Sequence, residues 1–142
     1  MLASIAGEYG IVNDPEIKFS NKGNAWMKVR VVSKDRVRDA NGQWSDGQAC
    51  FLDLIVTGKQ AEHLFDSVGK GDSIIATGKL QQNEWTDSEG AKRISYSIMA
   101  ENVGVSVRWG FAKTARFLGE RNTVANVKEQ FEAEEISSAP PF

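Results

Sequence analysis

Phe51 shares its parity with polar residues rather than with the apolar leucines that follow it. Leu52 and Leu54 share one parity, whereas Phe51 shares the other with Asp53 and Thr57. Successive side chains of a β-strand point to opposite faces, so a strand here places the Phe51 ring on a polar face. An aromatic ring in that position can stack against a flat, unsaturated ligand.

Three tryptophans occur in similar settings, close to basic residues. Trp26 has the parity of Arg30, and Trp85 has the parity of Lys79. The rings that we select as stacking candidates are Phe51, Trp85, Trp44 and Trp26, and the cations that we select as phosphate ligands are Arg30, Arg36, Arg38, Lys79 and Arg93. Bases of any identity stack on such rings at about 1–3 kcal/mol each, while cations follow the phosphates. The pattern therefore predicts binding of a single-stranded nucleic acid, and the alternative is that the rings pack at the edge of a small barrel.

The other reactive side chains do not indicate catalysis. His63 is the single histidine, so the chain cannot build a site with two His ligands, and we expect His63 to be solvated rather than part of a Ser–His or Cys–His arrangement. Cys50 has the parity of Leu52 and is predicted to be a buried, inert thiol. No cluster has metal-ligand spacing, and no glycine-rich segment fits a phosphate-binding loop. We expect no catalytic residue, no metal and no cofactor. A small metal-dependent nuclease stays open as an alternative.

The composition is typical of a soluble protein with one domain. The chain has 142 residues, of which 41% are hydrophobic and 25% charged. Its net charge of −2 and its pI of about 5.5 argue against a general duplex-binding protein. Residues 129–142 contain four glutamates and no basic residue, so the remainder is mildly basic. Apolar runs are far shorter than the ~20 residues of a membrane span, and the N-terminus does not read as a secretory signal, which predicts a cytoplasmic protein that binds no membrane.

A period of two dominates the first hundred residues and predicts a small β-barrel. Strands are expected at 4–12, 25–34, 49–57, 73–85 and 93–100, and an amphipathic helix at 59–68. Five strands with one helix between the third and fourth close most simply as an OB-fold barrel, an all-β architecture in which the helix covers one opening. Residues 103–109 alternate again and predict an extra C-terminal strand.

Two long loops and an acidic tail complete the expected organisation. The loops are expected at 35–48 and 84–92, each with turn residues that include a glycine. Residues 1–110 are predicted to form the OB-fold domain, which carries the expected nucleic-acid face. Residues 111–142 are predicted to form a flexible linker and a disordered acidic tail that ends in Pro-Pro-Phe.

Six segments in the same order and spacing identify a resemblance to a known family. They are 13–17 (NDPEI), 42–47 (GQWSDG), 58–62 (GKQAE), 70–80 (KGDSIIATGKL), 85–90 (WTDSEG) and 102–109 (NVGVSVRW). With these segments the chain resembles the bacterial and bacteriophage single-stranded DNA-binding proteins over residues 7–109 and at its last residues. The Val-Gly-x-Ser-x-Arg pattern at 103–108 is most similar to actinobacterial members and the phages of such hosts.

The resemblance implies an OB fold, assembled as a homotetramer, that binds and protects single-stranded DNA without sequence preference in replication, recombination and repair. It places family stacking positions at Phe51 and Trp85. The chain departs from the family pattern at Asp53, where a basic residue is usual, and at Thr57, where an aromatic residue is usual. A usual aromatic near the start of the long loop is also missing, and Trp44 is the candidate that replaces it.

The last residues match the acidic tip with which family members recruit replication and repair proteins. The predicted partner-binding residues are Glu134, Glu135, Pro140, Pro141 and Phe142. A free carboxylate and an aromatic ring would enter a basic-rimmed pocket of the partner, steered by the glutamates. The main alternative to DNA binding is an oligomeric OB-fold adaptor of a replication complex, for which protein binding is primary.

Overall fold

The structure is a computed structural model in which residues 1–115 are described. Six strands and one helix follow one another along these residues. They are β1 (Ser4–Ile11), β2 (Glu16–Phe19), β3 (Ala25–Arg38), β4 (Trp44–Thr57), α1 (Gly58–Ser67), β5 (Ser73–Thr86) and β6 (Lys92–Val105).

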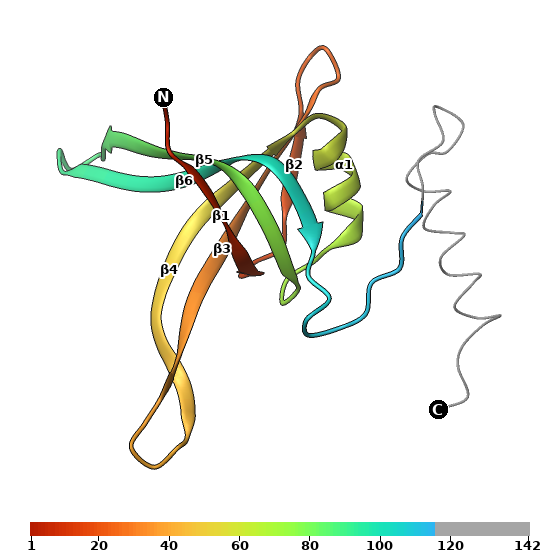
Figure 1. Cartoon of the computed structure of the whole chain (residues 1–142). Coiled ribbons are helices and arrows are strands. Elements are labelled where there is room, and N and C mark those ends of the chain that lie inside the picture. Colours follow the sequence, from red (N-terminus) through yellow and green to blue (C-terminus); the bar gives the residue numbers. More distant parts are fainter. Residues whose placement is uncertain (116–142) are drawn as a thin grey trace.

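The strands form one sheet that closes on itself. Their order is β1-β5-β6-β4-β3-β2, and an additional pairing of β1 with β3 closes five of them into a ring. The β4–β6 pair is parallel and the other pairs are antiparallel. Helix α1 follows β4 and precedes β5 in the chain, and it lies beside the barrel next to β2 (Figure 1). The predicted all-β OB fold, with a short helix in this position, is confirmed.

Alternation along the strands places the core inside the ring. Met27, Val29 and Val31 of β3 are buried against Leu54 and Val56 of β4, which pair with them in register. The apolar stripe of α1 adds buried Ala61 and Leu64 to the same core. Each burial removes an apolar side chain from water, about 1.5–3 kcal/mol for a fully buried aliphatic residue. The residues of opposite parity are left on the outer surface.

Both expected loops are in fact extended β-hairpins. Strands β3 and β4 run on to Arg38 and Trp44, and β5 and β6 run on to Thr86 and Lys92. The two hairpins project away from the barrel in different directions (Figure 1). The sequence pattern concealed these strand ends because both faces of a projecting hairpin meet solvent, so no apolar alternation is required there.

One hydrogen-bond pattern closes the turns of the projecting hairpins. At the β3–β4 turn, the Asp39 carboxylate accepts hydrogen bonds from the N–H groups of Asn41 and Gln43, at 2.9 Å each. Gly42 follows with a φ of +80°, a backbone conformation that glycine adopts at little cost. The Asp side chain and the glycine together make the turn a local property of the sequence.

The β5–β6 turn repeats this arrangement. The Asp87 carboxylate accepts from the N–H of Glu89 at 3.0 Å and from the N–H of Ala91 at 2.9 Å. Gly90 has a φ of +83°. The same chemistry at both tips indicates that each hairpin is set by its own residues and needs no contact with the barrel.

Three expectations about the chain need correction. A short strand, β2, occurs where none was expected, because Ile17 is its only inward apolar residue and four residues give too little alternation to detect. The extra strand expected at 103–109 is not separate, since β6 continues to Val105. Cys50 is exposed rather than buried, because β4 has already left the barrel for the hairpin at this position.

Tyr9 of β1 is a buried core residue that lies close to Cys50. The pKa of its phenol is raised mainly by this burial and, to a lesser extent, by the nearby Cys50 thiol.

No helix among residues 1–115 is long and apolar enough to cross a bilayer.

Gly78 is the position where the close approach of β5 and β6 tolerates no side chain. A Cβ there would collide with the Met99 carbonyl oxygen and lie 2.9 Å from Ile98 Cγ2, at an irregularity in the β5–β6 register. We expect Gly78→Ala to lower the free energy of unfolding by about 1–3 kcal/mol, measured by denaturant unfolding. Gly104→Ala, whose Cβ would meet nothing within 4 Å, is the control, and equal stability of the two variants would contradict the prediction.

Candidate nucleic-acid interface

The outer face of the sheet is built from residues that are opposite one another on β3 and β4. Trp26 pairs with Thr57, Arg30 with Asp53, and Val32 with Phe51. Directly opposite residues have Cβ atoms about 4.5–5.5 Å apart, so these pairs form successive rows of one surface. On β6, Ser97 pairs with Asp53 but is buried, and Asn83 of β5 donates a hydrogen bond to its hydroxyl at 3.1 Å.

Phe51 and Arg30 lie together in the middle of this face. The Phe51 side chain is 48% exposed, and the Arg30 guanidinium lies 5.8 Å from the centroid of its ring. Arg30 also contacts Asp53, with its Nη1 3.3 Å from Oδ1, and Lys28 Nζ lies 3.9 Å from Oδ2 of the same carboxylate. The largely buried Asp53 carboxylate thus neutralises part of the charge of Arg30 and Lys28 beside the exposed Phe51 ring.

The β3–β4 hairpin carries a second ring with an arginine. Trp44 is 59% exposed, and the Arg38 guanidinium lies 5.9 Å from its ring centroid. The Arg36 guanidinium is 3.1 Å from the Asp46 carboxylate, and the Lys34 ammonium is 3.8 Å from it. The hairpin therefore repeats the arrangement around Phe51, with an aromatic ring and several cations that share one aspartate.

The β5–β6 hairpin carries a third ring. Trp85 is 50% exposed and pairs in register with Arg93. Arg93 donates through Nε to the Asp87 carboxylate at 2.9 Å. Hydrogen bonds from the Ala91 N–H and then from Arg93 are the largest causes that lower the pKa of Asp87. The Asp87 carboxylate that closes the turn thereby also holds Arg93 close to β5, the strand that carries Trp85.

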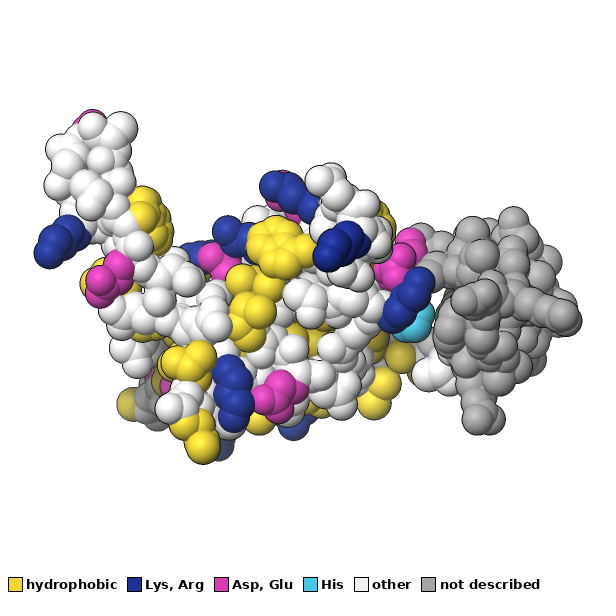
Figure 2. Space-filling model, turned by 90° about the horizontal axis from the view of Figure 1, so that it is seen from above, with side chains coloured by type: hydrophobic (Ala, Val, Ile, Leu, Met, Phe, Trp, Pro, Cys, Tyr) yellow, Lys and Arg dark blue, Asp and Glu magenta, His cyan; other side chains and the backbone are white. Residues whose placement is uncertain are grey.

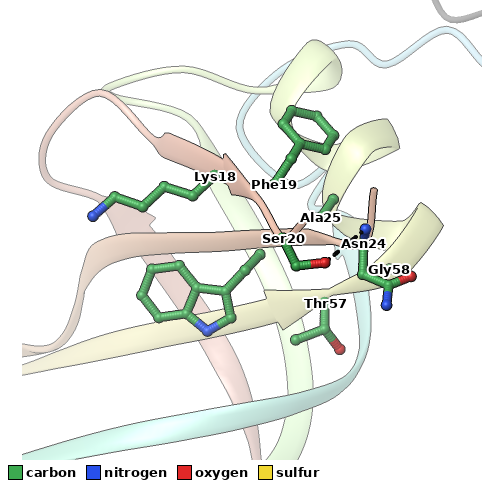
Figure 3. Close-up of a pocket in the computed structure, with 8 residues that line it drawn as sticks. Lys18, Phe19, Ser20, Asn24, Ala25, Thr57 and Gly58 are labelled. Carbon is green, nitrogen blue, oxygen red and sulfur yellow. Dashed lines mark hydrogen bonds between the residues drawn. The ribbon is translucent and has the colours of Figure 1, made fainter. Parts of the chain in front are cut away.

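Trp26 and Lys79 lie at two other margins of the face. Trp26 is 37% exposed and lines an open pocket with Lys18 and Thr57 (Figure 3). Lys79 lies next to β1, where its ammonium donates to the Ser4 hydroxyl at 2.6 Å and is 3.8 Å from Glu101. The nine residues selected from the sequence are therefore not one cluster but lie along the face and two hairpins.

Charges of both signs are mixed over this surface. Figure 2 shows basic and acidic side chains next to each other and next to hydrophobic ones on the face in view. Four of the five selected cations form ion pairs within residues 1–115, and the fifth, Arg38, donates to the Gly42 carbonyl oxygen at 3.2 Å. Exposed pairs of this kind are worth about 0–1 kcal/mol each, so a phosphate can replace the carboxylate.

Sequence reasoning overlooked three lysines of this surface. Lys28 and Lys34 share the aspartates named above, and Lys18 faces Trp26 across the β2–β3 ladder. Lys28 could have been selected, since it has the parity of Trp26 and Arg30. Lys18 depended on β2, which the sequence did not reveal. The predicted tail residues Glu134, Glu135, Pro140, Pro141 and Phe142 lie outside the described residues.

Comparison with protein families finds one family whose model matches most of the chain. Residues 5–106 match the model of the single-strand binding protein family. The chain belongs to the single-strand binding protein family. The match spans the whole barrel, both projecting hairpins and all four rings described above.

Two similar relatives come from actinobacteria, as the sequence resemblance indicated. Single-stranded DNA-binding protein 2 of Streptomyces coelicolor is 36% identical over 111 residues, which cover 78% of this chain and 56% of that protein. The single-stranded DNA-binding protein of Mycobacterium leprae is 35% identical over 101 residues, which cover 70% of this chain and 60% of that protein. The matched part thus spans little more than half the length of these relatives.

A solved structure confirms the fold of this family member. The crystal structure of a small single-stranded DNA-binding protein from Streptomyces coelicolor superposes with a TM-score of 0.70 at 21% identity. The superposition covers 77% of this chain and 98% of that one. At this level of identity the likeness concerns the fold.

The Asp87 carboxylate should make the β5–β6 turn sensitive to acid. Because its pKa is lowered in the folded chain, its contribution to the turn is present above the ordinary Asp value of 3.8 and is lost as the pH falls through the lowered value. We expect the Ala91 amide proton resonance to titrate with a midpoint below 3.8. Asp87→Asn should abolish that titration, whereas a midpoint at or above the ordinary value would contradict the assignment.

Proposed function

We propose that this chain binds single-stranded DNA without sequence preference. The observation that carries the proposal is the position of three aromatic rings that are each about half exposed to solvent: Phe51 lies on the outer face of the closed barrel, and Trp44 and Trp85 lie on the two projecting hairpins. The barrel interior is filled by other residues, so these rings make no contribution to its core. Stacking against bases is the interaction that such rings offer, and it does not distinguish one base from another.

The cations beside the rings would bind the phosphates. Arg30 lies next to Phe51 and Arg38 next to Trp44, so a nucleotide stacked on either ring brings its phosphate within reach of a guanidinium. Arg36, Lys79 and Arg93 would contact the strand along the hairpins and toward β1. Since most of these cations are already paired, the stacking contribution should be large relative to the ionic one. The names of the relatives, which are DNA-binding proteins, support this proposal.

The wider role proposed for the chain follows from its family. We propose that it assembles as a homotetramer and coats and protects unwound strands in replication, recombination and repair. Binding the open form in preference to paired strands would melt hairpins by mass action. Recruitment of partner proteins through residues Glu134, Glu135 and Pro140–Phe142, the domain division at residue 110 and a cytoplasmic location stay predictions.

Removal of the rings tests the stacking proposal directly. We expect Phe51→Ala and Trp85→Ala each to weaken binding of oligo-dT by about 5- to 150-fold, which corresponds to the ~1–3 kcal/mol of one stacked base. The measurement is a titration followed by tryptophan fluorescence at low and high salt. Quenching by oligo-dT should persist in part at high salt, because stacking is not screened as ion pairs are.

Phe65→Ala is the matched control, since Phe65 is also a partly exposed ring (38%) but lies on α1. It should leave the affinity unchanged. Normal binding by Phe51→Ala and Trp85→Ala would refute the proposal. Wild-type protein without any quenching would favour the adaptor, and metal-dependent cleavage of the oligonucleotide would favour the nuclease.

Replacement of Asp53 should strengthen binding, whereas replacement of the rings should weaken it. Its carboxylate shares the charge of Arg30 and Lys28, so Asp53→Asn should free both cations for phosphate. We expect binding of oligo-dT to tighten by up to about fivefold at low salt, in line with ~1 kcal/mol for an ion pair whose cations are exposed, and the salt dependence to steepen. Asp14→Asn makes the same change of charge at a residue that pairs with no cation of residues 1–115. Equal affinities of these two variants would contradict the prediction.

A further inference from the structure

An open pocket lies at the end of the outer face, between the β2–β3 hairpin and the end of β4. Its volume is about 690 Å³, and its lining comprises Lys18, Phe19, Ser20, Asn24, Ala25, Trp26, Thr57 and Gly58. Figure 3 shows that Lys18 and Phe19 leave β2 in opposite directions, while Ser20, Asn24 and Thr57 lie together on another side. The pocket therefore combines an exposed indole, a cation and a group of short polar side chains.

Lys18 differs from the cations in the rest of the face. It pairs directly with Trp26 across the β2–β3 ladder, so its side chain and the indole share the outer surface. Lys18 forms no ion pair or hydrogen bond with any side chain among residues 1–115. Lys28, in the next row, has Asp53 at 3.9 Å and is opposite Glu16. Lys18 is therefore a cation of the pocket lining whose charge no described carboxylate neutralises.

The polar lining is also available for a ligand. Thr57 immediately precedes α1, but its side chain makes no hydrogen bond to cap the helix. The Ser20 hydroxyl accepts a hydrogen bond from the Asn24 N–H at 3.1 Å, which leaves its proton and the Asn24 amide group free to contact a base edge or a sugar.

The pocket is continuous with the face that carries Phe51. Trp26 and Val32 are six residues apart on β3, and Val32 is opposite Phe51. At about 3.3 Å per residue, the two rings lie roughly 20 Å apart along one strand. A single strand that stacks on Phe51 and continues along β3 therefore arrives at Trp26.

From this placement we propose that the pocket is a nucleotide subsite, which a DNA strand stacked on Phe51 would reach by continuing along β3 to Trp26. The base stacks on Trp26, the phosphate binds the Lys18 ammonium, and the hydroxyl and amide groups of Ser20, Asn24 and Thr57 face the base edge and sugar. This subsite rests on the proposed function, because it extends the same strand beyond Phe51 onto the β2–β3 hairpin.

The test uses the full chain and an oligo-dT of about 16 nucleotides, the upper range of strand length for one OB fold. Lys18→Gln should reduce the slope of log affinity against log salt by about 0.7, the value for one phosphate contact of a single strand. Trp26→Leu should weaken binding by about fivefold or more. Lys22→Gln is the matched control, since Lys22 belongs to the same hairpin but does not line the pocket, and it should behave as wild type.

A second measurement observes the ring itself. The chain has four tryptophans, so replacement of Trp44, Trp85 and Trp109 by Phe leaves Trp26 as the only indole. Saturating oligo-dT should quench this remaining emission. Thermal unfolding of each variant shows that it is folded.

The possible results separate the two proposals. If wild-type protein does not bind oligo-dT, the proposed function fails. If wild-type protein binds and Phe51→Ala weakens it, while Lys18→Gln behaves as Lys22→Gln and the emission of Trp26 is unchanged at saturation, the subsite alone is refuted.

Discussion

Closure of the sheet through the β1–β3 pairing is the constraint on which the arrangement of the surface depends. Gly10 and Ile11 pair with Val32 and Val31 and complete the ring. Once the ring is closed, every strand has one face in the core and one in water, and the parity of a residue decides which face it joins. An aromatic side chain on the outer parity, such as that of Phe51, cannot be buried by the barrel itself. Its exposure is thus a consequence of topology and not of a local accident of packing.

Beyond the barrel, this constraint no longer applies and local chemistry replaces it. The β3–β4 and β5–β6 hairpins have no core between their faces, and an aspartate with a glycine at +80° to +83° closes each turn. Each hairpin also places an arginine beside or opposite a tryptophan. Two extensions with independent turns can adjust to a flexible strand, whereas the barrel between them keeps Phe51 and Arg30 in fixed register.

The limits of prediction from this sequence follow from the same division. Trp26 could be assigned to the outer face because it lies between buried Ala25 and Met27, and Phe51 because it precedes the buried alternation of Leu52 and Leu54. The hairpins, β2 and the exposure of Cys50 could not, since alternation is informative only where one face is buried. The ion pairs were equally hidden: Arg30 and Asp53 are 23 positions apart in the sequence, and only the register of β3 against β4 brings them to 3.3 Å.

Register also explains the two departures from the family pattern on β4. The sequence has Asp53 where a cation is usual and Thr57 where a ring is usual. In the structure, Asp53 is directly opposite Arg30, and Thr57 is directly opposite Trp26. Side chains so placed are about 4.5–5.5 Å apart at Cβ, close enough for a ligand above one to touch the other. In the same two rows β3 therefore carries a cation and an aromatic ring, Arg30 and Trp26, although Asp53 neutralises part of the Arg30 charge.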